Sequence, residues 1–290
     1  MKLKSNTKVA KTNSGDYIFE GLKTARKKKI TSRAFACLLG KNLFESKGKT
    51  ILERCGFVEK ESIDPYYTVR GAIGELLVKD YLIEMYLKYK KIKLQILSWN
   101  PKEVNFDNFP KNPDFGGLLD LAIPAPAEER AVVEVKSKSL KDLTFIDNKK
   151  GVEEEVLQGK FLGTLSKTPI CHMGYIFFNE EQETLLRNFV KDMLNLGKSL
   201  DGEDLEAKNV LKALNWRYEH FKIKIYKHEI DFVEIENLMQ ESKETLNNSI
   251  QTTIISRESF TPYEQTYLDG LVYGKGYIAP QSNNDDDAPF

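Results

Sequence analysis

Asp120, Glu134 and Lys136 are charged residues inside apolar runs of the kind that form β-strands. The runs are GGLLDLAI, residues 116–123, and AVVEVKSK, residues 131–138. Because side chains of a strand alternate between its two faces, Glu134 and Lys136 share one face and the intervening valine takes the other. Burying a charge without a partner costs several kcal/mol. The pattern therefore predicts that these charged side chains have a partner that compensates their charge.

The connector between the two runs, PAPAEE, contains two prolines and suits a hairpin loop. If the hairpin is centred on Ala127, Asp120 lies directly opposite Glu134, because both are equally far from that centre. Residues paired in this way have Cβ atoms about 5 Å apart, where like charges repel each other. A divalent cation between the two carboxylates would remove the repulsion, since Mg²⁺ prefers oxygen ligands. The alternative is that one acid faces solvent or pairs with Lys136.

Glu75 offers a third carboxylate in the middle of a long predicted helix, residues 67–89. Gly71 and Ala72 are its neighbours at four- and three-residue spacing on the same face. Small residues there would let the helix approach a sheet closely and bring Glu75 to the acidic pair. The alternative is a surface glutamate that pairs with Lys79 one turn later.

The rest of the chain alternates between helical and strand patterns, which indicates an α/β or α+β fold. Residues 100–115 are rich in Pro, Asn and Asp and predict a loop. We expect helices at 32–44, 152–165, 180–200 and 232–246, with Asp231 as the cap of the last, and strands at 91–99, 172–179 and 220–230.

The charge of the chain is unevenly distributed. The formal net charge is zero, yet residues 1–50 contain 13 Lys and Arg against 3 Asp and Glu. Such a basic segment suggests an anionic partner, with nucleic acid as the usual one, and the alternative is a solvated arm. We expect a basic, mobile arm at 1–30, a main domain at 31–280 and an acidic tail at 281–290. The basic residues expected to contact DNA are Arg26, Lys27, Lys28 and Lys29, together with Lys138.

The composition also narrows the class of protein. No apolar run approaches the roughly 20 residues that a membrane helix requires, so no membrane partner is expected. The three cysteines are scattered and form no ligand-spaced pair, which argues against a disulfide framework or a zinc site. A reducing cytoplasm, that of the host if a phage encodes the chain, fits this pattern.

Four motifs follow one another along the chain, namely RGAIGE (70–75), PDFGGLLDLAI (113–123), VVEVKSK (132–138) and EEEVLQGKFLG (153–163). In this order they resemble the PD-(D/E)XK nuclease superfamily, most closely its lambda-exonuclease-like (YqaJ-type) and RecB-like branch. Those families have a glutamate on a helix, an aspartate on a strand, Glu-x-Lys on the next strand and a glutamine on the following helix. The resemblance implies a restriction-endonuclease-like α/β core, with a mixed central sheet flanked by helices.

The resemblance also assigns roles to residues of this chain. Lys136 would orient the attacking water or help to deprotonate it, and Gln158 would position the site or the DNA backbone. Leu162 stands where the RecB-like pattern has a tyrosine four residues after the glutamine, which leaves the role of Gln158 open. The ligands of Mg²⁺, for which Mn²⁺ may substitute, would be Glu75, Asp120, Glu134 and the carbonyl of Val135.

Two residues are candidates for the aspartate that the resemblance places on a strand. By spelling, the aspartate of the "PD" motif is Asp114. The hairpin argument instead favours Asp120, and the site assigned above uses Asp120.

By this resemblance the chain is expected to be a metal-dependent deoxyribonuclease, an exonuclease that processes double-stranded DNA ends for phage-type recombination. The resemblance further implies a ring-shaped homo-oligomer and a recombinase partner that anneals single strands. Two alternatives remain. One is a sequence- or structure-specific endonuclease, and the other is a non-catalytic single-stranded-DNA-binding protein.

The last residues, SNNDDDAPF, are similar to the tip of bacterial single-stranded-DNA-binding proteins. In those proteins the tip docks its phenylalanine and terminal carboxylate into basic pockets of replication and repair enzymes. The alternative is a solvated acidic tail. The expected docking peptide comprises Asp285, Asp286, Asp287, Pro289 and Phe290.

Deleting Pro289 and Phe290 should abolish the pull-down of a protein that binds such tails and leave nuclease activity intact. A pull-down that survives the deletion refutes docking.

Overall fold

The computed structural model describes the chain except for residues 21–28, 43–44, 60–61, 100–102, 201 and 275–290. The chain divides into two compact units. The sheet unit comprises residues 29–36 and 61–241, and the terminal unit comprises residues 1–28, 37–60 and 242–290. Both units include residues of the main domain expected at 31–280.

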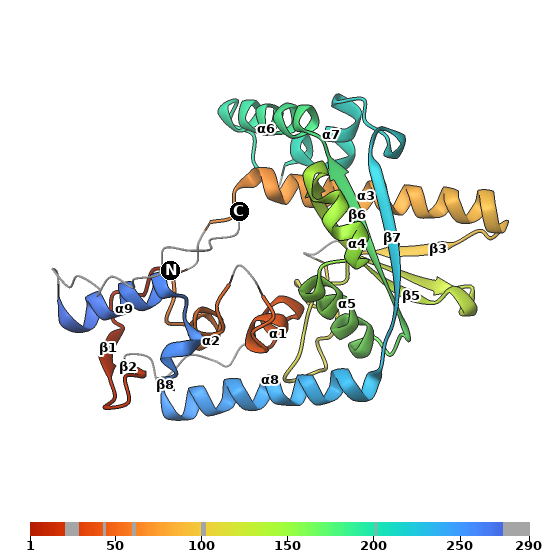
Figure 1. Ribbon diagram of the computed structural model, residues 1–290. Helices are drawn as coiled ribbons and strands as arrows, with labels where there is room; N and C mark the ends of the chain where they lie inside the picture. The colour runs from red at the N-terminus through yellow and green to blue at the C-terminus, as the bar shows by residue number, and fades with distance from the viewer. Residues whose placement is uncertain (21–28, 43–44, 60–61, 100–102, 201, 275–290) are drawn as a thin grey trace. The chain divides into compact units, whose positions relative to one another are not determined.

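A five-stranded sheet forms the centre of the sheet unit (Figure 1). Its strand order is β3-β4-β5-β6-β7. β5 and β6 run parallel, and the other neighbours are antiparallel, so the sheet is mixed. This confirms the predicted α/β class with a mixed central sheet. The strands are β3 (Gln95–Ser98), β4 (Leu121–Ala125), β5 (Ala131–Ser139), β6 (Ile170–Phe178) and β7 (Lys222–Glu229).

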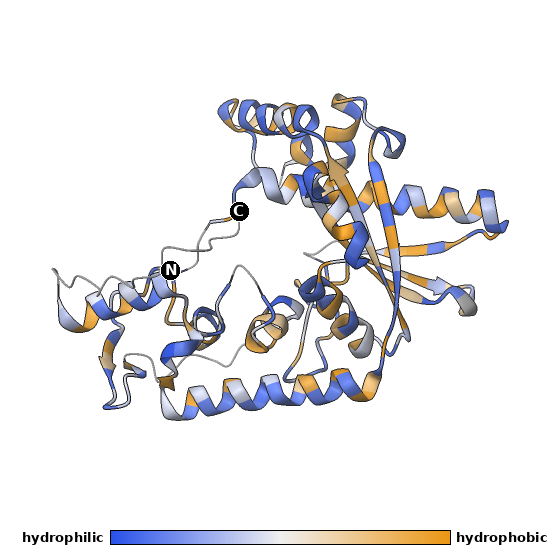
Figure 2. Ribbon diagram, viewed as in Figure 1, coloured by the Kyte–Doolittle hydropathy of each residue, from blue (hydrophilic) through white to orange (hydrophobic). Residues whose placement is uncertain are grey.

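Helices cover both faces of this sheet. α3 (Pro65–Met85), which continues as a π-helical turn at Tyr86–Lys90, packs on one face of β5 and β6. α5 (Glu153–Leu165) packs on the other face. Apolar residues dominate the strands between them (Figure 2), and Ile73, Leu77, Val133 and Ile176 belong to one buried cluster. The remaining helices with residues in this unit are α1 (Ser32–Leu38), α4 (Leu143–Lys149), α6 (Glu180–Asn195), α7 (Ala207–Ala213) and the first part of α8 (Phe232–Thr252).

The β4–β5 hairpin has the register that the sequence predicts. Leu121 pairs with Val133, and this alignment sets Asp120 beside Glu134. One detail of the prediction is wrong, because β4 begins only at Leu121 and Asp120 lies in the bend before it. The bend turns the Asp120 carboxylate toward β5, where its Oδ2 accepts a hydrogen bond from the Val135 amide at 2.8 Å.

Close packing of α3 on the sheet depends on a glycine, but not on the one expected. Gly71 has open space around it and Ala72 is exposed, so neither residue mediates the contact. A Cβ added at Gly74 would instead collide with the Ser137 hydroxyl and approach Ile176 to 3.1 Å. Gly74 immediately precedes Glu75, so this close contact of the helix with the sheet lies next to the candidate ligand.

The terminal unit contains a three-stranded sheet of order β1-β2-β8. A mobile arm was expected at 1–30, whereas the described part of this segment includes a β-hairpin whose Tyr17 is fully buried. The hairpin is held by Asp269, which accepts a hydrogen bond from the Tyr17 hydroxyl and pairs with Lys11 and Arg257. The elements are β1 (Lys8–Lys11), β2 (Tyr17–Glu20), α2 (Lys47–Cys55), the end of α8, β8 (Ile254–Ile255) and α9 (Pro262–Tyr273).

Within the described ranges, no helix combines the length and the apolar character needed to cross a membrane.

Replacing Gly74 by alanine should lower the free energy of unfolding by about 1–3 kcal/mol, because overpacking forces the helix off the sheet. The matched change Gly71→Ala should be neutral or stabilising by up to about 1 kcal/mol, since only helix propensity changes. Urea denaturation of both variants measures the difference. Equal stability of the two variants would contradict the packing described for Gly74.

Candidate active site

Glu134, Lys136 and Gln158 form a hydrogen-bonded chain on the α5 face of the sheet. Lys136 Nζ donates to Glu134 Oε1 at 2.7 Å and to Gln158 Oε1 at 3.2 Å. Burial acts to lower the pKa of Lys136, but the Glu134 and Asp120 carboxylates raise it overall, so the ammonium stays protonated. Gly159 lets α5 come this close, because a Cβ there would meet Met173 Sδ at 3.0 Å.

Asp120 joins this group from the bend before β4. Its hydrogen bond from the Val135 amide fixes the carboxylate. Burial, followed by repulsion from Glu134 and Glu75, raises the pKa of Asp120 well above its usual value. Asp114 lies earlier in the loop, where its backbone carbonyl accepts a hydrogen bond from the Ile30 amide at 2.8 Å.

Glu75 reaches the same group from α3. Burial and the nearby Glu134 raise the pKa of Glu75 to about 7, and Lys136 acts in the opposite direction. Lys79 donates to the Ser98 hydroxyl at 3.0 Å, a contact that differs from the alternative of a surface pairing with Glu75. The structure therefore brings Glu75, Asp120, Glu134 and Lys136 close enough together for their charges to act on one another's pKa.

The donor set of this cluster fits a hard divalent cation. Three carboxylates from α3, the β4 bend and β5 repel one another, and oxygen donors of this kind are the ligands that Mg²⁺ and Mn²⁺ prefer. Among the described residues, no three acidic, histidine or cysteine side chains already stand close enough together to enclose an ion. In this structure the Lys136 ammonium compensates the charge of Glu134. The role of the Val135 carbonyl as a ligand stays a prediction.

The residues expected to bind DNA or a partner have different outcomes. Lys29 pairs with Asp107 at 2.7 Å and donates to the Phe109 carbonyl, so it helps to hold the loop before β4. Lys138 pairs with Glu155 at 2.7 Å. The other predicted residues lie outside the part of the chain that the structure describes, namely Arg26, Lys27 and Lys28 and the tail residues Asp285, Asp286, Asp287, Pro289 and Phe290.

Glu155 is a buried carboxylate next to the site that sequence reasoning missed. It is 7% exposed and lies on α5. The available signal was its spacing, since a residue three positions before Gln158 shares its helix face. In the sequence Glu155 is the third of three consecutive glutamates, and such a run at a helix N-terminus usually indicates only a favourable interaction with the helix dipole.

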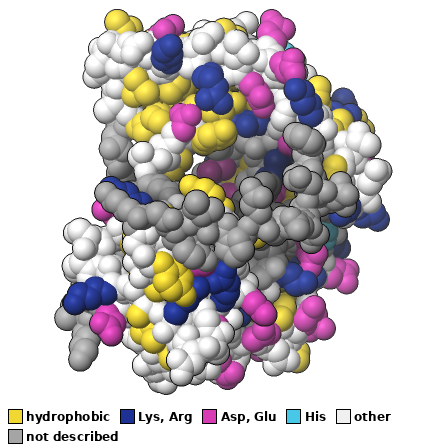
Figure 3. All heavy atoms as spheres, turned by 60° about the vertical axis from the view of Figure 1, so that its left-hand side comes forward, with side chains coloured by type: hydrophobic (Ala, Val, Ile, Leu, Met, Phe, Trp, Pro, Cys, Tyr) yellow, Lys and Arg dark blue, Asp and Glu magenta, His cyan; other side chains and the backbone are white. Residues whose placement is uncertain are grey.

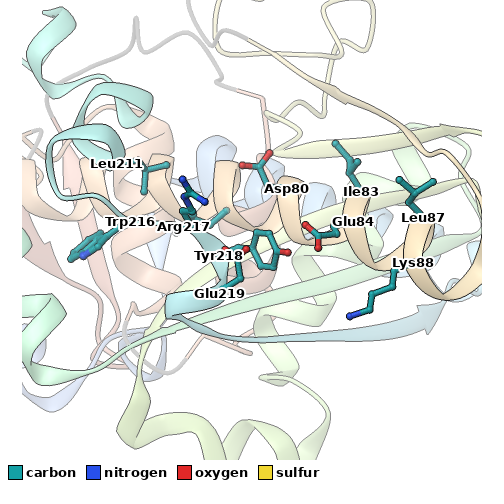
Figure 4. Close-up of a pocket in the computed structure, with 11 residues that line it drawn as sticks. Asp80, Ile83, Glu84, Leu87, Lys88, Leu211, Trp216, Arg217, Tyr218 and Glu219 are labelled. Carbon is teal, nitrogen blue, oxygen red and sulfur yellow. The ribbon is translucent and has the colours of Figure 1, made fainter.

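A groove of about 800 Å³ lies along another side of α3 (Figure 4). Asp80 and Glu84 of α3 line it opposite Trp216 and Tyr218. A hydrogen bond with Glu84 and burial raise the pKa of the Tyr218 hydroxyl. Glu75 is not part of the lining, so the groove is separate from the carboxylate cluster.

No protein-family model matches the chain. The uncharacterized protein MG373 homolog of Mycoplasma pneumoniae is 33% identical over 93 residues, which is 32% of this chain and 31% of that protein. The matched segment thus spans about a third of that relative's length.

Solved structures align over more of the chain. An alkaline exonuclease from Laribacter hongkongensis aligns with 78% of this chain and 92% of its own, at 13% identity and a TM-score of 0.42. A phage-related exonuclease from Haemophilus somnus aligns with 78% and 96%, at 10% identity and a TM-score of 0.44.

The raised pKa of Glu75 predicts a pH-dependent stability. Its pKa is about 7 in the folded protein against an ordinary value of 4.5, so the folded state keeps a proton that the unfolded chain has lost. The stability that this provides is complete below the ordinary pKa and is lost as the pH rises through about 7. In EDTA, wild type should therefore lose up to about 3 kcal/mol more stability than Glu75→Gln between about pH 4.5 and pH 8.

Denaturant unfolding of both proteins at the two pH values measures this difference. A saturating concentration of Mg²⁺ at pH 8 should recover the loss in wild type and leave Glu75→Gln unchanged. Identical pH dependence in the two proteins would show that Glu75 is not held among other carboxylates.

Proposed function

We propose that this protein is a metal-dependent DNA nuclease that hydrolyses phosphodiester bonds at the cluster of Glu75, Asp120, Glu134 and Lys136. The observation that supports this most strongly is the convergence of three carboxylates from separate segments on one partly exposed lysine. A cluster with this much mutual repulsion is a poor device for stability alone. It is well suited to a site where a cation and an anionic substrate meet.

Each residue has a distinct part in the proposed reaction. Glu75, Asp120 and Glu134 would hold the divalent ion, which when bound polarises the phosphoryl oxygen and makes a water molecule more acidic. Lys136 is protonated and solvent-accessible at 23% of its side chain, so its ammonium can offset the negative charge that develops on the phosphate. Gln158 accepts from the Lys136 ammonium and thereby fixes its direction. The Val135 amide holds Asp120 in its bend.

The distribution of surface charge favours attraction of DNA by particular basic side chains over attraction by the net charge of the protein. Figure 3 shows Lys and Arg side chains interspersed with Asp and Glu side chains on the visible face. Since the net charge of the chain is zero, contacts with phosphates depend on lysines at particular places, such as β5. We propose exonucleolytic processing of duplex ends for phage-type recombination, on the resemblance of the four motifs. The rival activity is endonucleolytic cleavage by the same residues.

A digestion series with linear duplex, closed circular and single-stranded DNA tests this function. Linear duplex should be degraded with Mg²⁺ or Mn²⁺ and not with EDTA, while closed circles should survive because they offer no end. Lys136→Ala should reduce turnover by at least about 100-fold, the usual effect of removing one group that stabilises the charge of the transition state. Binding of Mn²⁺ to this variant should persist, since the three carboxylates remain.

Cleavage of closed circles would indicate an endonuclease. Salt-sensitive DNA binding without cleavage in either metal would indicate a binding protein, and full activity of Lys136→Ala would refute the assigned site.

A further inference from the structure

A second lysine–carboxylate pair lies next to the catalytic pair on β5. Lys138 Nζ is 2.7 Å from Glu155 Oε1, just as Lys136 Nζ is 2.7 Å from Glu134 Oε1. The side chains of Lys138 and Lys136 are 24% and 23% exposed, and those of Glu155 and Glu134 are 9% and 8% exposed. β5 thus presents two ammonium groups to solvent to a similar extent, each backed by a buried carboxylate.

The two pairs share one face of the sheet and one helix. Lys136 and Lys138 are two positions apart on a strand, so both point toward α5. There, Gln158 contacts Lys136, and Glu155 contacts Lys138 from one turn earlier. The intervening Ser137 points to the opposite face, where its hydroxyl donates to the Arg70 carbonyl of α3.

The surroundings of Glu155 indicate more than a structural role. Its Oε2 is buried and accepts no hydrogen bond of ordinary geometry among the described residues, although the Tyr175 hydroxyl lies near enough to interact with the Glu155 carboxylate. A buried carboxylate that pairs with a partly exposed lysine is a weak source of stability, because the ion pair does not fully compensate the desolvation of the carboxylate. Two apolar residues at these positions would stabilise the same contact at least as well.

The spacing of the two ammonium groups matches a nucleic-acid strand. Residues two apart on a β-strand are separated by about 6.6 Å, which is comparable to the separation of neighbouring phosphates along a DNA strand. An ammonium has three donors, so Lys138 can keep its bond to Glu155 and donate to a phosphate at the same time. A lysine held in place before DNA arrives loses less conformational entropy on binding.

We propose that Lys138 binds the phosphate adjacent to the scissile one and that Glu155 is a positioning residue that aims Lys138 at it. This inference rests on the proposed nuclease function, which places the scissile phosphate at Lys136. β5 then contacts two neighbouring phosphates through two lysines. Lys136 acts in catalysis, and Lys138 sets the register of the DNA strand.

The test is equilibrium binding of a fluorescent linear duplex in EDTA, where the proposed nuclease cannot act, over a series of salt concentrations. Lys138→Met should weaken binding and reduce the slope of log affinity against log salt by about one, the signature of one lost phosphate contact. Lys138→Arg should keep the slope. Lys198→Met serves as matched control, because Lys198 forms an ion pair of 2.9 Å with Asp204 at the surface, and it should change neither quantity.

Glu155→Gln separates positioning from structure. It should weaken binding a few-fold with the wild-type salt slope, and it should have no further effect when Lys138 is already methionine. If Lys138→Met does not fold because Glu155 is left unpaired, the double variant Lys138→Met/Glu155→Gln replaces it. Thermal unfolding of each variant identifies those that are folded at the assay temperature.

Three results would overturn the inference. The first is a wild-type salt slope in both Lys138→Met and the double variant. The second is a loss of DNA affinity on Glu155→Gln that is equally large when Lys138 is already methionine. The third is a folded Glu155→Gln protein that has a lower melting temperature but unchanged DNA affinity. The nuclease function fails separately, if wild type shows the predicted slopes yet cuts no DNA in Mg²⁺ or Mn²⁺.

Discussion

Repulsion among the carboxylates of Glu75, Asp120 and Glu134 is the constraint on which the rest of this structure depends. Glu75, Asp120 and Glu134 come from a helix, a bend and a strand, and burial raises the pKa of Glu75 and of Asp120. The chain tolerates this because Lys136 supplies a counter-charge from the same strand as Glu134. The folded protein therefore keeps an electrostatic imbalance that a divalent ion would relieve, and that relief links the stability of the unit to its proposed chemistry.

The fold brings the cluster together by close backbone approach on both faces of the sheet. Gly74 lets α3 contact β5 on one face, and Gly159 lets α5 contact β5 and β6 on the other. The parallel pairing of β5 with β6 keeps the active strand in the interior of the sheet. Side chains mounted on such paired strands and packed helices are held more rigidly than side chains on loops, which suits a site whose geometry must be maintained against charge repulsion.

Much of the sheet unit could be predicted from the sequence, because its elements have strong periodic patterns. The register of the β4–β5 hairpin followed from the spacing of Asp120 and Glu134 around Ala127, and the cap of α8 followed from Asp231, whose side chain accepts a hydrogen bond from the Glu234 amide. The errors occurred where local pattern and tertiary contact diverge. Gly71 and Gly74 are both glycines of one helix, and only the packed structure tells which of them faces the sheet. The hairpin of the terminal unit was missed because its burial depends on Asp269, some 250 residues away in the chain.

The most direct test of the central claim is a crystal structure of the protein grown with Mn²⁺ and measured at the manganese absorption edge. An anomalous peak coordinated by Glu75, Asp120 and Glu134, with Lys136 moved off Glu134, is the result that this account predicts. An Mn²⁺ ion bound only elsewhere, with the Lys136–Glu134 pair intact and Glu75 turned to solvent, would contradict it.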